Sequence, residues 1–176
     1  MGYAPPDRRG DLRPRRADRQ GRDPRRHEPA GVIVVADTSG LLALFNRSDP
    51  EHFAARRAAD SASAVVVSPL ALTEVHHVAS IRAERRVADG ILRLIADRIA
   101  AGRIVVPEVD ARVIRTAVEI RGHYAAMNLD LVDAMCVCLA EAFDTDAVLT
   151  LDRRDFRVLR PLTGYAAFRL LPDDFQ

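Results

Sequence analysis

The stretch Val32-Ile-Val-Val-Ala36, followed directly by Asp37, is the clearest structural signal in the sequence. Its residues are continuously apolar and mostly β-branched, which favours a strand buried on both faces at the centre of a parallel sheet. A carboxylate directly after such a strand lies at the carboxyl edge of the sheet, where open parallel sheets bind their ligands. The stretch therefore indicates an α/β protein and marks the edge at which to search for a site.

The rest of the chain repeats this pattern. Further short apolar runs predict strands at 65–67, 104–106 and 147–150, with a fifth at 168–171 on an edge. Helices are predicted between them at 40–45, 50–60, 68–85, 87–101, 110–124 and 131–143. In the helix over 87–101, Ile91, Leu94, Ile95 and Ile99 form one stripe that we expect to be buried. Strands alternating with helices predict a three-layer α/β/α fold around a central, mostly parallel sheet of four or five strands.

The first 30 residues differ in composition from the rest. They hold nine of the 26 arginines and five of the ten prolines, and their apolar residues are sparse. Such a segment cannot bury enough surface to offset its ordering entropy. We therefore predict a disordered tail over 1–31 and a single folded domain over 32–176. The tail is either an RNA-contacting arm or the product of a gene start placed too far upstream.

Composition excludes several classes of protein. All 26 basic residues are arginine, so the lysine of a phosphate-binding P-loop and the amine of a Schiff-base enzyme are both missing. Cys136 and Cys138 lie two apart on a predicted helix, where they point in different directions and form neither a disulfide nor a zinc site. Without disulfides the expected location is the cytoplasm. No apolar run reaches 18 residues, so no membrane association is expected.

Four carboxylates from four separate segments are predicted to meet at the carboxyl edge of the sheet. Asp37 and Asp152 follow the first and fourth strands, Glu74 lies in the helix after the second strand, and Asp133 lies near the start of the helix before the fourth. Each carboxylate also has a purely structural interpretation. Asp37 and Asp152 occupy helix N-cap positions, and Asp133 would stabilise the start of its helix. Glu74 taken alone suits the solvated face of a helix. Together they would repel one another unless a cation neutralises them. Oxygen ligands without His or Cys fit Mg²⁺ or Mn²⁺.

Four segments in order resemble the motifs of the PIN-domain ribonucleases, and most closely the VapC-type toxins of bacterial toxin–antitoxin pairs. They are Val34-Val-Ala-Asp37-Thr-Ser-Gly-Leu-Leu42, Ser68-Pro-Leu-Ala-Leu-Thr-Glu74-Val, Leu129-Asp-Leu-Val-Asp133-Ala and Leu149-Thr-Leu-Asp152-Arg-Arg-Asp155-Phe156. The resemblance implies a Mg²⁺-dependent endoribonuclease with Asp37, Glu74, Asp133 and Asp152 as catalytic and metal-binding residues. It also implies a homodimer and a cognate antitoxin that covers the site. The sequence Met135-Cys-Val-Cys138 departs from the family, which usually carries smaller residues there.

The sequence gives weaker indications of a functional role for several residues near the four acids. His76 and His77 are adjacent and lack ligand spacing, so we interpret them as structural. Asp130 and Asp155 fit either a helix cap or a supporting place beside the acids. Thr38, Ser39 and Thr150 carry hydroxyls near the acids, and Arg153 and Arg154 are candidates for phosphate contacts. Tyr124 suits either a half-buried packing role or stacking on an RNA base.

The predicted reaction is metal-assisted hydrolysis of a phosphodiester in a folded RNA. Asp37 and Asp133 are the expected direct ligands, with Asp152 next, and Glu74 would act through water. A dehalogenase-like phosphatase is disfavoured because Ser39 stands where it needs a second Asp. The alternative from another class is a non-catalytic RNA-binding PIN-like module that uses the arginine-rich tail.

Overall fold

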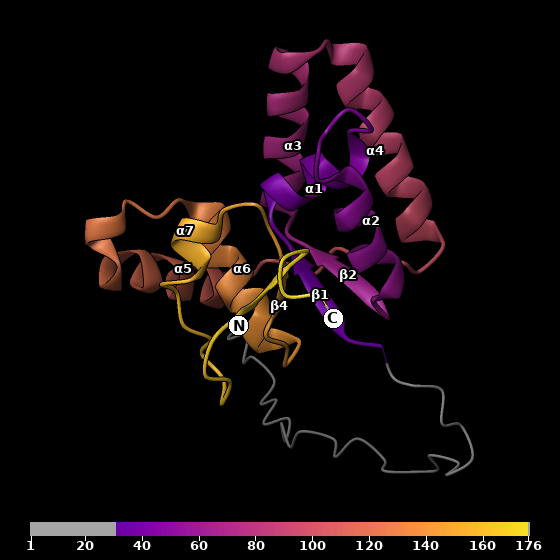
Figure 1. Cartoon of the computed structure of the whole chain (residues 1–176). Helices are drawn as coiled ribbons and strands as arrows, with labels where there is room; N and C mark the ends of the chain where they lie inside the picture. The colour runs from indigo at the N-terminus through magenta and orange to yellow at the C-terminus, as the bar shows by residue number, and fades with distance from the viewer. Residues whose placement is uncertain (1–30, 176) are drawn as a thin grey trace, which may run out of the picture.

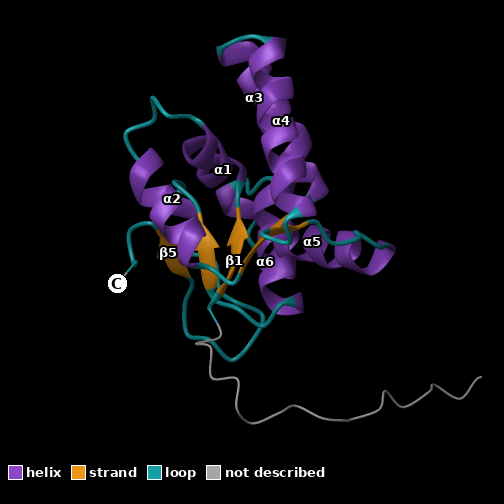
Figure 2. Cartoon of the chain, turned by 90° about the vertical axis from the view of Figure 1, so that its right-hand side faces the viewer, coloured by secondary structure: helices purple, strands orange, loops and turns teal. Residues whose placement is uncertain are grey.

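The computed structural model describes residues 31–175, so the prediction of a disordered tail falls almost wholly on residues outside it. Five parallel strands form one sheet in the order β3-β2-β1-β4-β5. The strands are β1 (Ile33–Ala36), β2 (Ala64–Val67), β3 (Ile104–Val105), β4 (Ala147–Leu149) and β5 (Arg169–Leu171). The predicted α/β class and parallel sheet are confirmed (Figure 1). Strand β5 lies at an edge of the sheet, as expected (Figure 2).

Seven α-helices and one 3₁₀ turn connect the strands within the described residues. They are α1 (Thr38–Phe45), α2 (His52–Ser61), α3 (Pro69–Arg82), α4 (Arg85–Ala100), α5 (Ala111–His123), the turn η1 (Ala125–Met127), α6 (Leu131–Ala142) and α7 (Arg153–Phe156). All six predicted helices are present with small shifts at their ends. Helix α7 was not predicted as an element, because four residues are too few to show a helical period.

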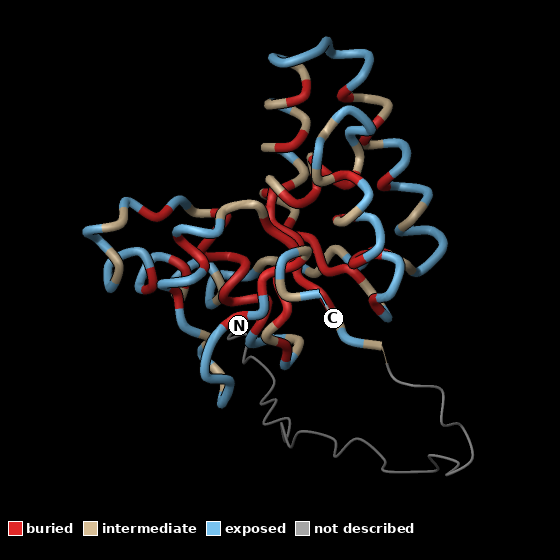
Figure 3. Tube along the Cα trace, viewed as in Figure 1, coloured by how far each residue is buried: buried red, intermediate tan, exposed pale blue. Residues whose placement is uncertain are grey.

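The sheet is buried on both faces, as its continuous apolar strands predict. Val34 and Ala36 of β1 pack into a core with α1 to α4, whereas Val35 faces the opposite core, with α5, α6 and Phe156. Figure 3 shows this burial concentrated where the strands cross the centre of the molecule. The central strand β1 and its neighbour β4 pair Ala36 with Leu149, so their carboxyl ends are level. The residues that follow these two strands therefore lie side by side.

The hairpin of α3 and α4 projects from the body of the protein (Figure 1). Ala88, Ile91 and Ile95 of α4 are buried. The prediction of a wider buried stripe is wrong at Leu94 and Ile99, which are 53% and 39% exposed. Within residues 31–175, α4 packs mainly against α3 and β3, and Leu94 and Ile99 lie outside these contacts. No helix among residues 31–175 is long and apolar enough to cross a membrane.

Candidate active site at the carboxyl edge of the sheet

Asp37 is the N-cap of α1 and is 5% exposed. Its Oδ1 accepts a hydrogen bond from the Thr38 backbone N–H at 2.6 Å, and its Oδ2 accepts one from the Ser39 hydroxyl at 2.7 Å. Burial raises the pKa of Asp37 above its ordinary value, while these donors oppose the rise by favouring the charged form. The capping role and the predicted functional role therefore fall on one carboxylate, whose two oxygens are held in fixed positions.

Two hydroxyls connect Asp37 to the segment that carries Asp152. Thr150 donates its Oγ1 hydrogen to Asp37 Oδ2 at 3.0 Å and accepts from the Asp152 backbone N–H at 3.0 Å. Ser39 donates to the same carboxylate and accepts from the Leu151 N–H at 2.8 Å. The turn after β4 is thereby fixed to the start of α1. The sequence placed both hydroxyls near the acids, and the structure shows that they hold the acids in position.

Asp152 is the N-cap of α7. Its Oδ1 accepts from the Asp155 backbone N–H at 3.1 Å, which confirms the N-cap position that the sequence indicates for Asp152. Asp155 itself is 7% exposed and receives a hydrogen bond from Arg154 Nε at 2.8 Å. The cap leaves the second carboxylate oxygen of Asp152 without a protein donor among the described residues.

Asp133 lies in the first turn of α6 and is 7% exposed. Its pKa is raised to about 8, first by burial and then by the negative charges of Asp130, Asp37 and Asp152. Its backbone N–H is capped by the Asp130 carboxylate at 2.9 Å. The carboxylates of Asp37, directly after β1, of Asp152, in the turn after β4, and of Asp130 therefore all act electrostatically on Asp133.

Glu74 lies farther out, on α3, and accepts a hydrogen bond from the Thr38 hydroxyl at 2.7 Å. Because Thr38 also donates its N–H to Asp37, one residue bridges the two carboxylates. Beside Glu74 is a groove of about 410 Å³ between α3 and the start of α6, lined also by His77, Asp130 and Leu131. His77 thus lies beside the site, a placement that its sequence context did not indicate.

The donor set is suited to a divalent cation of the Mg²⁺ type. It offers carboxylate and hydroxyl oxygens, and the negative charges of Asp130, Asp37 and Asp152 add to burial in raising the pKa of Asp133. With the side chains in their present conformations, no group of three Asp, Glu, His or Cys residues among 31–175 surrounds a single metal position. Mg²⁺ commonly binds through one or two carboxylates, with waters and substrate phosphates completing its shell, so this spacing is compatible with it.

Other residues named from the sequence have structural partners. His76 Nε2 lies 3.0 Å from Asp89 Oδ1 and joins α3 to α4. Arg153 pairs with Asp173, with 2.7 Å between Nη2 and Oδ1, so its charge is already engaged. Cys136 and Cys138 are free thiols buried on α6, as expected, and burial raises the pKa of both.

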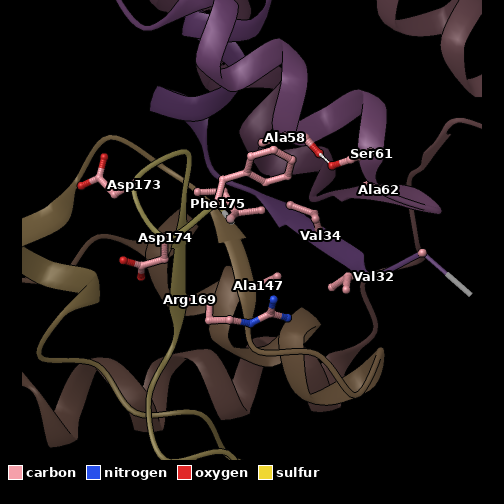
Figure 4. Close-up of a pocket in the computed structure, with 12 residues that line it drawn as sticks. Val32, Val34, Ala58, Ser61, Ala62, Ala147, Arg169, Asp173, Asp174 and Phe175 are labelled. Carbon is pink, nitrogen blue, oxygen red and sulfur yellow. Dashed lines mark hydrogen bonds between the residues drawn. The ribbon is translucent and has the colours of Figure 1, made fainter. Parts of the chain in front are cut away.

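A larger cavity than this groove lies in a different part of the molecule (Figure 4). It measures about 710 Å³ and is lined by Val32, Ala147 and Arg169, which lie at the beginnings of strands, and by residues of α2 and the C-terminal segment. Its charged side chains are paired, Arg169 with Asp146 and Asp174 with Arg157, each at 2.7 Å. None of the four candidate acids lines it, so the candidate site remains the opposite, carboxyl edge.

Comparisons with known proteins agree with this arrangement. The PIN domain family pattern matches residues 34–160, well over half of the chain. Ribonuclease VapC26 from Mycobacterium tuberculosis is 34% identical over 140 residues, covering 79% of this chain and all of that protein.

Two solved structures share the fold. One is the Mycobacterium tuberculosis VapC20 toxin, described as cleaving the sarcin–ricin loop, with a TM-score of 0.60, 24% identity and coverage of 69% of this chain and 91% of that one. The other is VapBC2 from Rickettsia felis bound to promoter DNA, with a TM-score of 0.56 and 14% identity. That match covers 79% of this chain and 98% of the Rickettsia chain. The family pattern over residues 34–160 and the 34% identity to Ribonuclease VapC26 show that the chain belongs to the PIN-domain family, among its VapC-type ribonucleases.

Proposed function

We propose that this endoribonuclease toxin uses Asp37, Asp133, Asp152 and Glu74 to bind Mg²⁺ or Mn²⁺ and to hydrolyse a phosphodiester bond of a folded RNA. The observation that carries the proposal is the placement of Asp37, Asp133 and Asp152 at one edge of the sheet, where burial first, and then the charges of Asp130, Asp37 and Asp152, raise the pKa of Asp133. Such a site becomes fully ionised when a cation neutralises it. The relationship to Ribonuclease VapC26 supports cleavage of RNA as the reaction.

Each acid has its own part in the proposed mechanism. Asp37 and Asp133 are the proposed direct ligands, because both are buried and border the same edge. Asp152 adds a carboxylate oxygen from the turn after β4. Glu74, held by Thr38, orients a water molecule from the more exposed side. A bound divalent ion would supply charge stabilisation at the scissile phosphate and lower the pKa of a bound water.

The partners proposed for this chain follow from its family. The Rickettsia VapBC2 structure contains a complex, and we propose that a cognate antitoxin likewise binds this chain and covers the acidic edge. We also propose a homodimer and a cytoplasmic location, the latter because both cysteines remain unpaired. The proposed substrate is a structured RNA with an exposed loop, because unpaired bases are accessible to recognition. The fold shared with a toxin described as cleaving the sarcin–ricin loop is consistent with such a substrate.

The test combines RNA cleavage with growth. Purified protein is incubated with total RNA in Mg²⁺, Mn²⁺ or EDTA, and new 5′ ends are mapped by sequencing. We expect discrete cleavage with either metal and none in EDTA. Induction in cells should arrest growth, and co-expression of a small neighbouring gene for a DNA-binding protein should restore it. RNA binding that persists in EDTA without any cleavage would support the non-catalytic RNA-binding module instead.

A further inference from the structure

A second cavity lies between α5, α6 and the segment that follows α7. It measures about 560 Å³, which falls within the range of about 300–1,000 Å³ typical of small-ligand pockets. Ile120 and Tyr124 form its inner wall, Leu162 lies at its rim, and His123, Glu119 and Arg160 supply polar groups. None of these residues belongs to the acidic site.

The chemistry of this cavity suits a flat heteroaromatic ring. The rings of His123 and Tyr124 meet edge to face with centroids 4.9 Å apart, and Tyr124 is half-buried against the core. Unpaired bases stack on aromatic side chains and on the guanidinium plane of arginine, and their edges are read by hydrogen bonds. Glu119 and Arg160 form no ion pair with any residue in 31–175. Arg160 Nη1 donates one hydrogen bond, at 3.4 Å, to the Arg157 carbonyl, which leaves its other donors for a ligand.

The cavity and the acidic edge share two segments of the chain. Val137 in its wall lies four residues after Asp133 on α6, about one helical turn away. Arg160 follows Asp152 on the segment that begins with α7. Helix α6 and the segment that begins at Asp152 therefore each carry both an acid and a residue of the cavity wall.

We propose that the cavity binds an unstacked base of the RNA substrate beside the scissile phosphate, and so contributes to the choice of cleavage site. This inference rests on the proposed ribonuclease function. The Glu119 carboxylate can only accept hydrogen bonds, so it favours a base with an exocyclic amino group, such as cytosine over uracil. The cavity would then make a base-specific contact with the RNA that is separate from the cleavage reaction at the acids.

The first test measures binding of fluorescent oligocytidylate and oligouridylate to the full chain. Wild type should bind oligocytidylate more tightly by about 5- to 150-fold, the range given by one good base contact. Leu162→Trp should remove this preference by filling the cavity from its rim, where Leu162 is 46% exposed and tolerates a larger side chain. Glu119→Gln should reduce it. The matched control is Val158→Trp, on the same segment, 51% exposed and not in the cavity wall.

The second test measures cleavage of a stem–loop RNA that the wild type cuts. Leu162→Trp should slow cleavage by a similar factor, whereas Val158→Trp should not. Cleavage without any cytosine preference, or a preference that Leu162→Trp leaves intact, would overturn the inference and leave the proposed function standing. A pocket-dependent preference without cleavage would overturn the function alone. If Leu162→Trp weakens inhibition by the antitoxin but leaves base preference unchanged, the cavity belongs to the antitoxin and the inference is wrong.

Discussion

At the scale of single residues, Asp133 is where function and stability oppose each other most clearly. Its carboxylate is buried beside other carboxylates, so ionising it costs free energy in the folded protein. The amide of asparagine has nearly the same shape and no charge. We therefore expect Asp133→Asn to leave the melting temperature unchanged or higher in EDTA, while cleavage of RNA falls by orders of magnitude. Lower stability with activity retained would show that Asp133 is purely structural.

The same residue predicts how stability depends on pH without metal. Its pKa is about 8 in the folded protein, against an ordinary value of 3.8. Between these values the folded state holds a proton that the unfolded state has lost, so stability falls as pH rises. The slope contributed by one such group is at most about 1.4 kcal/mol per pH unit. Denaturant titrations in EDTA from pH 5 to pH 9 should show this decline, flattening above the folded pKa, with a smaller decline in Asp133→Asn.

Thr150 offers a way to disturb the site without altering a carboxylate. Its hydroxyl donates to Asp37 and accepts from the Asp152 N–H, so Thr150→Val removes both contacts at nearly constant volume. We expect a stability loss of about 1–3 kcal/mol, because a buried donor and acceptor lose their partner. Cleavage should fall further than this loss of folded protein explains, because Asp37 and Asp152 are no longer held together. Equal activity per folded molecule, measured after correction by denaturant titration, would contradict the positioning role.

At the scale of elements, the approach of α1 to β4 brings the acids together. A Cβ atom added at Gly40 would lie 2.2 Å from the Leu149 carbonyl oxygen, a backbone atom with no freedom to move aside. Gly40→Ala should therefore push α1 away from β4 and destabilise the fold by about 1–3 kcal/mol or more. Gly90→Ala is the matched control, since Gly90 lies in α4 with no atom within 4 Å of an added Cβ. That change should stabilise by about 0.5–1 kcal/mol, as measured by thermal and denaturant unfolding.

At the scale of the whole molecule, the acidic edge couples cation binding to folding. The unfolded chain cannot assemble carboxylates from four segments, so an ion that binds the folded state stabilises it by mass action. We expect the melting temperature to rise with Mg²⁺ concentration, by an amount equivalent to about 2.7 kcal/mol at 100 times the dissociation constant. Asp133→Asn should lose most of this rise. A rise of equal size with Na⁺ at matched ionic strength would indicate screening rather than a specific site.

The four acids illustrate how far sequence reasoning reaches at the site. Asp37 and Asp152 could be placed at strand ends from the apolar runs before them, and both are helix caps as predicted. Their connection through Thr150 could not be predicted, because Thr150 and Asp37 are 113 positions apart and meet only when β1 pairs with β4. His77 beside the groove was missed for a similar reason, since the orientation of α3 relative to α6 decides which helical face borders the acids.

The sequence by itself determined what depends on neighbouring residues. These features are the α/β class, the strands, the helices with small shifts at their ends, and the caps at Asp37 and Asp152. These follow from local hydrogen bonding and from the period of apolar residues, which a single segment carries. Only the tertiary structure decided the strand order, the raised pKa of Asp133 and the exposure of Leu94 and Ile99 on α4. The physical reason is that burial and electrostatic repulsion depend on which segments become neighbours. An apolar stripe shows that a helix can bury a face, but only packing determines whether another layer covers it.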